Sequence, residues 1–272
     1  MFIYSHWKKF CKEVSDKYNC IRVDEIPSQT LESDWVAIKH DVETNTRKAL
    51  KIAQIENKYN IRATYYVQSY LLTDNADILK EISDLGHEVS YHYDVLDSNN
   101  GNFEAAIEEF SDTISKFKSH GFLVNTVCPH GNPIMRREGW HSNKDFFRNK
   151  RIVSLYPKIF DVVVHAREII KSNFLYISDA GYGWKLIGNV DENDINNIGD
   201  MDIHGLSAML KLISNNKKVI ISSHPHRWSS NRSKFYSQII LFKFLKWSAK
   251  LVKNIPILKD ILHKFYYLAK KF

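Results

Sequence analysis

The stretch WVAIKHDVETNTRKALKIAQIENKYNIRATYYVQ, residues 35–68, decides the fold class. It starts with a short, mostly apolar run, WVAIKH (35–40), of the kind found in buried strands. After a polar break, apolar residues recur at helical spacing from Thr46 to Tyr59, and the β-branched and aromatic run IRATYYVQ (61–68) follows. A strand, a helix and a second strand in this order indicate two parallel strands joined by a crossover helix.

The same alternation continues along the chain. Two further amphipathic helices are expected at 76–85 and 102–120, and each ends before a glycine, Gly86 or Gly121. The polar stretch from Pro133 to Lys158 indicates an excursion or lid. Later strands are expected at HEVSYH (87–92), FLVNTVCPH (122–130), DVVVHA (161–166), FLYISDA (174–180) and KKVIISSHPH (217–226). The pattern predicts an α/β fold, either a barrel or an open sheet.

Composition narrows the class of protein. The chain has 272 residues, 44% of them hydrophobic, which excludes intrinsic disorder and is enough for a sizeable core. The cysteines Cys11, Cys20 and Cys128 are an odd number without zinc-type spacing, so neither a disulfide scaffold nor a cysteine metal cluster is expected.

The N-terminal apolar run is short and its lysines follow it, unlike a secretory signal, and no apolar run reaches the roughly 18 residues of a membrane span. We therefore expect a cytoplasmic protein, soluble or peripheral to the membrane.

The basic character of the chain lies in its C-terminal part. Residues 232–272 hold 10 Lys and Arg and 1 Asp, so the rest of this +7 chain is slightly acidic. Lysines alternate with large apolar residues at spacings near three and four, on both sides of Pro256. This predicts a main domain over 1–231 and a tail of basic amphipathic helices over 232–272. The tail could pack on the domain, or bind an anionic surface at the inner face of the membrane. Nucleic acid is not expected as a partner, because no nucleic-acid motif accompanies the tail.

Polar residues suited to metal binding and acid–base chemistry gather where the expected strands end. In parallel α/β folds, reactive residues lie at these ends, on the loops that follow the strands. One such residue alone is more often structural, but five strand ends carry them. Imidazoles and carboxylates together suit zinc or another first-row divalent metal. The residues at these ends are His40, Asp41 and Glu43; His92 and Asp94; His130; Asp179 and Trp184; and His224 and His226.

Taken in order from Val36 to Trp228, the motifs resemble those of the polysaccharide deacetylases of the NodB-homology type, carbohydrate esterase family 4. IKHDVE is similar to the family's TFDDG, NIRATYYV to KATFFV, and LGHEVSYHYD to GHEIGNHTxxH. CPHG stands in the place of RxPYG, and SSHPHRW resembles the segment around the catalytic histidine. The combination is most similar to the divergent WbmS-like branch, which is associated with bacterial surface-polysaccharide clusters. The resemblance implies a distorted (β/α) barrel followed by the helical tail.

Carried over residue by residue, the resemblance implies the catalytic groups. Asp41 becomes a metal ligand, His40 stands where the family has its base, and His224 matches the general acid that protonates the leaving amine. The expected catalytic residues are therefore His40, Asp41 and His224. Asp179 is expected to orient His224, and Trp184 to form an apolar wall for the substrate.

The resemblance also implies a metal site with one ligand replaced. His92 matches the first metal histidine of the family, but the second falls on Leu96, which cannot bind a metal. His130 is the first choice as a substitute, with Asp94 and Glu43 as alternatives. The expected metal set is Asp41, His92 and His130. The residues expected to bind substrate are Glu43, Asp94, Asp179, Trp184 and His226.

The expected function is the metal-dependent removal of an acetyl or formyl group from an N-acylated sugar, with zinc as the expected metal. The sugar could be polymeric, lipid-linked or nucleotide-linked. Two alternatives from other classes stay open: a catalytically inactive carbohydrate-binding protein, and a membrane-surface adaptor that acts through its basic tail. Metal content distinguishes the adaptor, which needs no stoichiometric metal.

Overall fold

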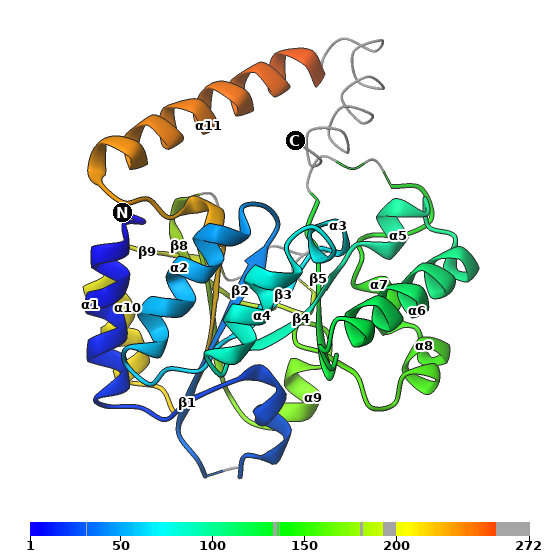
Figure 1. Ribbon diagram of the computed structural model, residues 1–272, viewed down its shortest axis with the longest axis horizontal. Coiled ribbons are helices and arrows are strands. Elements are labelled where there is room, and N and C mark those ends of the chain that lie inside the picture. Colours follow the sequence, from blue (N-terminus) through cyan, green and yellow to red (C-terminus); the bar gives the residue numbers. More distant parts are fainter. Residues whose placement is uncertain (31, 133–134, 136, 180–181, 193–199, 254–272) are drawn as a thin grey trace.

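The computed structural model describes residues 1–30, 32–132, 135, 137–179, 182–192 and 200–253 (Figure 1). A ten-stranded, mostly parallel sheet forms its centre, and helices connect most of its parallel strands. The expected α/β class with parallel strands and crossover helices is therefore confirmed.

Strands and helices alternate through most of the chain. The strands are β1 (Cys20–Ile21), β2 (Trp35–Val42), β3 (Thr64–Val67), β4 (Glu88–Tyr93), β5 (Thr126–Pro129), β6 (Phe160–Asp161), β7 (Leu175–Ser178), β8 (Trp184–Ile187), β9 (Met201–Ile203) and β10 (Lys218–Ser223). The helices are α1 (Tyr4–Ser15), α2 (Thr46–Asn57), α3 (Ser69–Leu72), α4 (Ala76–Asp84), α5 (Val95–Ser98), α6 (Phe103–Ser119), α7 (Asp145–Arg148), α8 (Lys150–Leu155), α9 (Ala166–Ile170), α10 (Leu206–Ser214) and α11 (Arg232–Lys253). Short 3₁₀ segments lie at Val23–Ser28 and Pro225–Arg227.

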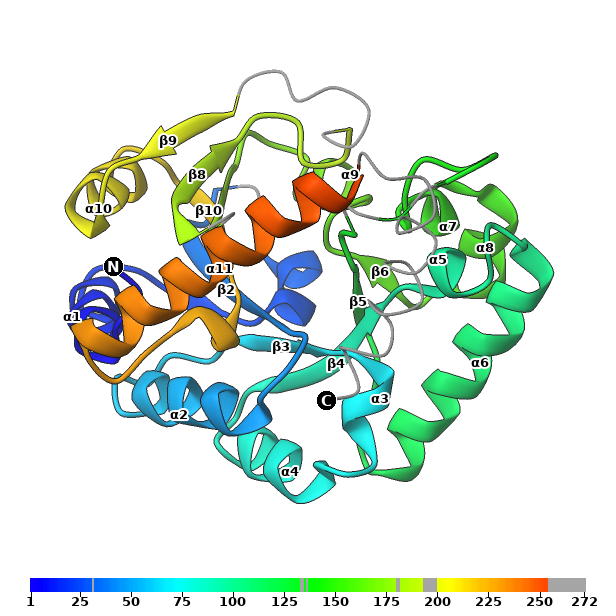
Figure 2. The same cartoon turned by 90° about the horizontal axis from the view of Figure 1, so that it is seen from above.

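The sheet follows a single path of strands in the order β6-β5-β4-β3-β2-β10-β7-β8-β9, and β1 pairs with the first part of β2. The pairs from β6 to β7 are parallel, and β8 and β9 continue the sheet in antiparallel fashion. Seen from above, the helices surround the strands (Figure 2). Within the described residues the two ends of the path, β6 and β9, do not pair with each other. The (β/α) barrel is therefore open and distorted.

The two faces of the sheet carry different cores. The outer face joins Val36, Ile38 and Val42 of β2 to apolar side chains of α1, α2, α4, α6 and α10. The inner face carries a second apolar cluster that includes Trp35 and Ala37. Because successive residues of a strand point to opposite faces, positions 39, 41 and 43 continue the inner face. Polar side chains at those positions therefore point into the mouth of the barrel.

One expected strand is wrong. Of the run 161–166, only Asp161 is in a strand, because β6 ends there. Oδ1 of Asp161 accepts the backbone N–H groups of Val163 and Val164 at 2.7 and 2.9 Å. Such local hydrogen bonds compete with strand pairing, and here the chain turns into α9. The expected excursion from Pro133 to Lys158 contains the short helices α7 and α8.

The first turns of α11 are anchored to the main body of the protein. Phe235 is buried, and its ring centroid lies 6.3 Å from that of Phe2 and 6.4 Å from that of Tyr182. The hydroxyl of Ser229 donates to Oε1 of Gln238 at 2.5 Å, which ties the helix to the segment before it. The start of the tail thus packs on the barrel, as one of the two expectations had it.

The remainder of the tail is only partly described. The expected second helix, beyond Pro256, lies outside the described residues, and the domain boundary at residue 231 stays a prediction. No helix in the described ranges is long and apolar enough to cross a membrane.

Candidate metal centre

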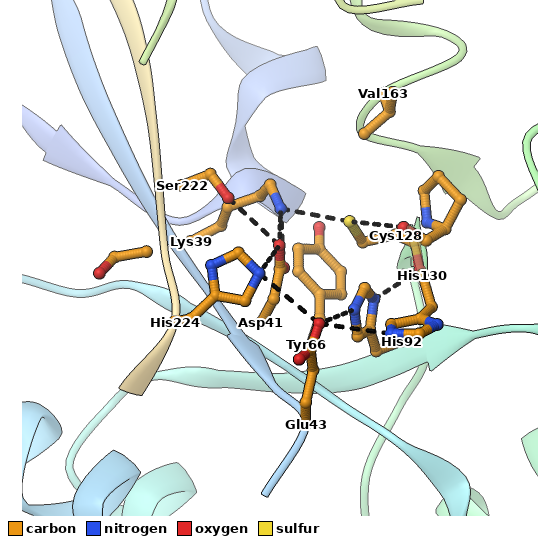
Figure 3. A network of polar contacts seen from close by, with 12 residues as sticks. Lys39, Asp41, Glu43, Tyr66, His92, Cys128, His130, Val163, Ser222 and His224 are labelled. Atoms are coloured by element: carbon orange, nitrogen blue, oxygen red, sulfur yellow. Dashed lines mark hydrogen bonds and ion pairs between the residues drawn. The ribbon is translucent and has the colours of Figure 1, made fainter. Parts of the chain in front are cut away.

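Polar side chains converge at the carboxyl ends of the parallel strands (Figure 3). Strand pairing explains why, since His92 of β4 lies beside Cys128 of β5, and Lys39 of β2 lies beside Ser222 of β10. Residues far apart in the sequence therefore share one site. Its members are Lys39, Asp41, Glu43, His92, Cys128, His130, Ser222 and His224.

Glu43, His92 and His130 form a group that we call the outer cluster. One potential ligand atom from each lies within 4.8 Å of the others. Oε1 of Glu43 is 3.4 Å from Nε2 of His130 and 3.9 Å from Nε2 of His92. Nδ1 of His92 donates to the carbonyl oxygen of Cys128 at 3.0 Å. In the neutral imidazole this contact leaves the lone pair on Nε2, the nitrogen that faces Glu43.

Asp41, His92 and Cys128 form a second group of potential ligands, which we call the inner cluster. Here a lysine already supplies a cation. Nζ of Lys39 lies 2.7 and 2.8 Å from the two carboxylate oxygens of Asp41 and 3.2 Å from Sγ of Cys128. The hydroxyl of Ser222 donates to Oδ2 of Asp41 at 3.2 Å. Both oxygens of Asp41 are therefore engaged by residues of the chain.

Charges in the two clusters are strongly coupled. Burial alone would lower the pKa of Lys39, but the adjacent Asp41 carboxylate outweighs it and raises that pKa. Burial would raise the pKa of Asp41, but the same ion pair holds it below its usual range. Burial would also lower the pKa of His92, yet Asp41 and Glu43 raise it to about 10. The surroundings of His92 therefore favour a positive charge, either a proton or a metal ion.

His224, which follows β10, is held from behind by Asp179. Its Nδ1 donates to Oδ1 of Asp179 at 2.6 Å, and its backbone N–H donates to Oδ2 at 2.8 Å. Nη1 of Arg227 also donates to Oδ1 of Asp179, at 2.7 Å. Burial would raise the pKa of Asp179, but Arg227 and His224 hold it below its usual range. A carboxylate that stays ionised fixes the orientation of the imidazole, as in other acid–base pairs.

The free nitrogen of His224 faces the clusters. Nε2 lies 3.6 Å from Oε1 of Glu43 and 3.9 Å from Oδ2 of Asp41. His226 lies beside it, with ring centroids 5.7 Å apart. Burial lowers the pKa of His226 to about 4, so this imidazole is neutral near pH 7. Nε2 of His224 is therefore the nitrogen placed to exchange a proton with a bound molecule.

A cavity of about 670 Å³ opens over the two clusters, a volume within the usual range for small-molecule sites. Both clusters, His224 and His226 line it. Further lining comes from Lys144, Tyr176, Tyr182, Lys185, and Gln238 and Leu241 of α11.

The outer cluster fits a divalent metal. Two imidazoles and one carboxylate are a ligand set that suits zinc. Nε2 of His92, which faces Glu43, is buried and has no hydrogen-bond partner among the described residues. The expected set of Asp41, His92 and His130 does not occur as one group, since Glu43, named as an alternative, takes the place of Asp41.

The expectation that His40 acts as a catalytic base is wrong. His40 points to the outer face of β2, opposite to Asp41, because neighbouring strand residues alternate. Its side chain is fully buried, with Nε2 2.7 Å from Oε1 of Glu56. The hydroxyl of Tyr65 and the indole N–H of Trp7 also donate to Glu56, at 2.7 and 3.1 Å. His40 thus belongs to a polar network inside the outer core.

Three residues expected to bind substrate do not line the cavity within the described part of the chain. Trp184 is buried against Phe2 and Trp228, with ring centroids 5.2 and 6.4 Å away. Asp94 precedes α5 and stands outside the lining. Asp179 is fully buried behind His224. Trp184 is therefore a core residue and Asp179 a positioning residue, whereas Glu43 and His226 do line the cavity.

Sequence reasoning missed Lys39 and Cys128. Lys39 follows four apolar residues of β2 and is only 1% exposed. The signal was available, because the period of two along β2 puts 39, 41 and 43 on one face. Cys128 gave no such signal, since its place in the site depends on the pairing of β5 with β4.

Comparisons with known proteins give only distant matches. No protein-family model matches the chain, and no curated protein matches its sequence. Its fold is similar to that of a pseudoenzyme of carbohydrate esterase family 4 from Bacillus anthracis, at 12% identity and a TM-score of 0.47, over 78% of this chain and 61% of that one. A family 4 carbohydrate esterase from Streptomyces lividans in complex with acetate matches at 15% identity and a TM-score of 0.44, over 71% of this chain and 79% of that one. A family 4 esterase from Streptococcus mutans matches at 14% identity and a TM-score of 0.45, over 85% of this chain and 90% of that one.

The matches differ in how much of each known protein this chain covers. The chain spans about three fifths of the length of the Bacillus anthracis protein. All three structures are of carbohydrate esterase family 4, the family whose motifs this sequence resembles. Identities of 12–15% and TM-scores below 0.5 establish neither membership of the family nor a reaction.

Proposed function

We propose that this protein is a metal-dependent hydrolase that removes an acetyl or formyl group from the nitrogen of a sugar in bacterial surface-polysaccharide synthesis. In this proposal it is a divergent polysaccharide deacetylase of the WbmS-like branch. The observation that carries the proposal is one cavity that a metal-ligand set and a positioned histidine line side by side. Oε1 of Glu43, in the outer cluster, lies 3.6 Å from Nε2 of His224.

Glu43, His92 and His130 would hold the metal, which we propose to be zinc. A zinc ion there would supply Lewis acidity, polarising the acyl carbonyl group and lowering the pKa of the attacking water.

His224 is the group that we assign to proton transfer. Asp179 takes the Nδ1–H, so a proton on Nε2 points into the cavity. Nε2 would take a proton from the attacking water as the new C–O bond forms and give it to the nitrogen of the sugar as the amide bond breaks, so that acetate or formate and an amine leave. The imidazolium formed before that transfer is stabilised by the Asp179 carboxylate, which is itself fixed by Arg227.

The substrate is proposed to be an N-acylated sugar that is lipid-linked or nucleotide-linked. The cavity volume suits one sugar unit and its neighbouring groups better than a large macromolecular surface. Tyr176 and Tyr182 are among the residues that line the cavity.

We further propose a cytoplasmic location, with α11 resting on an anionic membrane surface. Tyr236, Ile240 and Leu241 are 54%, 68% and 57% exposed on this helix, and Lys234 and Lys243 are exposed too. Exposed apolar groups beside lysines are typical of helices that lie in a membrane interface.

Two measurements on the purified protein test the proposal. Metal content is measured after exposure to zinc, and release of acetate or formate is measured with N-acetylated and N-formylated sugars. We expect stoichiometric zinc and release of one of the acids. Stoichiometric zinc without release of either acid would contradict the proposed reaction, and absence of zinc would overturn the proposed metal dependence.

A further inference from the structure

We propose that the ammonium group of Lys39 takes the place of a metal ion in the inner cluster, so that metal is directed to the outer cluster. Metal binding by the outer cluster rests on the proposed function. The role of Lys39 in the inner cluster rests only on the contacts that its ammonium group makes.

The position of the ammonium is the first argument. Nζ of Lys39 lies 2.7 and 2.8 Å from the oxygens of Asp41 and 3.2 Å from Sγ of Cys128. These are two of the three ligand groups of the inner cluster. Figure 3 shows the ammonium between them, on the side of Asp41 away from Glu43. The cation of this cluster is thus covalently attached to the chain.

Burial is the second argument. Lys39 is 1% exposed, so its charge is not held by water. The ring centroids of Tyr66 and Tyr176 lie 5.5 and 5.9 Å from Nζ, within the range of cation–π attraction. The ammonium is thus held by a carboxylate, a sulfur and two aromatic rings at the wall of the cavity. A metal ion at Asp41 would have to stand beside this fixed positive charge, and like charges repel strongly where water is excluded.

The single free nitrogen of His92 is the third argument. Both clusters need His92, but its Nδ1 is used by the carbonyl of Cys128, which leaves Nε2 alone. This nitrogen can serve one metal ion. With Lys39 in the inner cluster, Nε2 is left for the metal held by Glu43 and His130.

The arrangement also keeps a thiol away from the metal. The ligand set of the inner cluster, one carboxylate, one imidazole and one thiolate, would bind zinc or cobalt. Removing the lysine side chain should therefore create a sulfur-containing metal site. Cys128 would give up its thiol proton to the buffer when the metal binds.

Cobalt absorption tests this inference, because cysteine ligation gives a thiolate-to-cobalt charge-transfer band in the near ultraviolet. Four folded proteins are titrated with Co²⁺: wild type, Lys39→Ala, the double variant Lys39→Ala/Cys128→Ser, and Lys144→Ala. The last is a matched control, since Lys144 lines the same cavity. We expect the band only in Lys39→Ala, with Co²⁺ bound about tenfold or more tightly than by the double variant.

Other outcomes are decisive as well. A thiolate band in the wild type, or a folded Lys39→Ala protein without one, would overturn the inference. If Lys39→Ala does not fold, Cys128→Ser decides: unchanged Co²⁺ affinity supports the inference, and lost binding overturns it. A wild type that binds no metal, together with a band in Lys39→Ala, would refute the proposed metal dependence and still support the role of Lys39.

Discussion

Oδ1 of Asp179 lies 2.6 Å from Nδ1 of His224, and Oδ2 of the same carboxylate accepts the backbone N–H of His224 at 2.8 Å. Both oxygens of one buried carboxylate therefore hold one residue. The imidazole can turn neither its Nδ1 nor its ring plane without losing a charge-assisted hydrogen bond. This relationship decides which nitrogen meets the substrate.

Asp179→Asn should reduce turnover without affecting the metal. The change removes the negative charge that stabilises the imidazolium and the acceptor that fixes its tautomer, so we expect kcat to fall about 10²–10⁴-fold. Steady-state kinetics and metal analysis measure the two effects. Asp202→Asn is the control, because that carboxylate is exposed on β9, 4.0 Å from Lys185. An unchanged kcat in Asp179→Asn would contradict the positioning role.

His224→Ala should keep the metal and lose the proton transfer. We expect a rate lower by about 10²–10⁴-fold, the usual size of lost acid–base catalysis, with zinc content equal to that of the wild type. Zinc analysis alongside the kinetics separates the two roles. Loss of zinc in this variant would make His224 a ligand and refute its assignment as the acid.

Glu56→Gln should destabilise the fold, although it lies outside the cavity. Glu56 accepts from Tyr65 and Trp7, and contacts His40 in a fully buried network. Leaving the partners of a buried carboxylate without their acceptor costs about 1–3 kcal/mol, so urea unfolding at pH 7 should show a loss of that size. The exposed Glu104, paired with Arg151, provides the control Glu104→Gln, which should leave the unfolding curve unchanged. Equal stability of Glu56→Gln and wild type would contradict a structural role for the network.

The same carboxylate should contribute to the pH dependence of stability. Burial raises the pKa of Glu56, but His40 and the hydrogen bonds outweigh it, so the pKa lies below its ordinary value of 4.5. A carboxyl group of this kind stabilises the fold above about pH 4.5, and the contribution is lost as the pH falls through the folded-state pKa. The difference in unfolding free energy between wild type and Glu56→Gln should therefore shrink below pH 4.5. A difference that grows on acidification would contradict this.

Helix α11 should separate into a packed and a membrane-facing side. Ile240 is 68% exposed whereas Phe235 is 4% exposed. Ile240→Glu should weaken sedimentation with anionic phospholipid vesicles and leave the melting temperature unchanged. Phe235→Ala should lower the free energy of unfolding by about 3–5 kcal/mol, because it removes a buried aromatic ring and leaves a cavity. Salt screens the attraction between lysines and anionic lipids, over about 8–10 Å at ordinary ionic strength and less strongly at low salt. Wild-type protein that fails to bind the vesicles even at low salt would therefore refute the membrane proposal.

The sequence was sufficient for the alternation of strands and helices between Trp35 and Pro129 and for the place of the site, whereas β1, β8 and β9 were not expected. Some elements are specified by the residue pattern of a short stretch alone. Examples are the buried strands at 35–40 and 217–226 and the helix from Thr46. Parallel strands bring their carboxyl ends together, and this rule alone assembled Glu43, His92, His130 and His224. The run 161–166 failed because the side chain of Asp161 hydrogen-bonds to the next backbone N–H groups, a competition that apolar content does not reveal.

Roles within the site were harder to predict. His40 and Asp41 are adjacent in the sequence, and matching them to a motif ignored the alternation that separates their faces. Trp184 follows a strand that was expected correctly, but its packing partner Phe2 comes from the other end of the chain. The ion pair of Lys39 with Asp41 changes the role of Asp41, and such a pairing depends on side-chain reach inside the barrel. Contacts of this kind are fixed by the tertiary structure.

The zinc affinity of two carboxylate variants tests the central claim most directly. Wild type, Glu43→Gln and Asp41→Asn, each shown to be folded by circular dichroism, are equilibrated with buffered zinc, and bound metal is measured. The account predicts one zinc per chain in the wild type, an affinity near that of wild type in Asp41→Asn, and an affinity lower by about 100-fold or more in Glu43→Gln. Loss of zinc in Asp41→Asn together with retention in Glu43→Gln would contradict it.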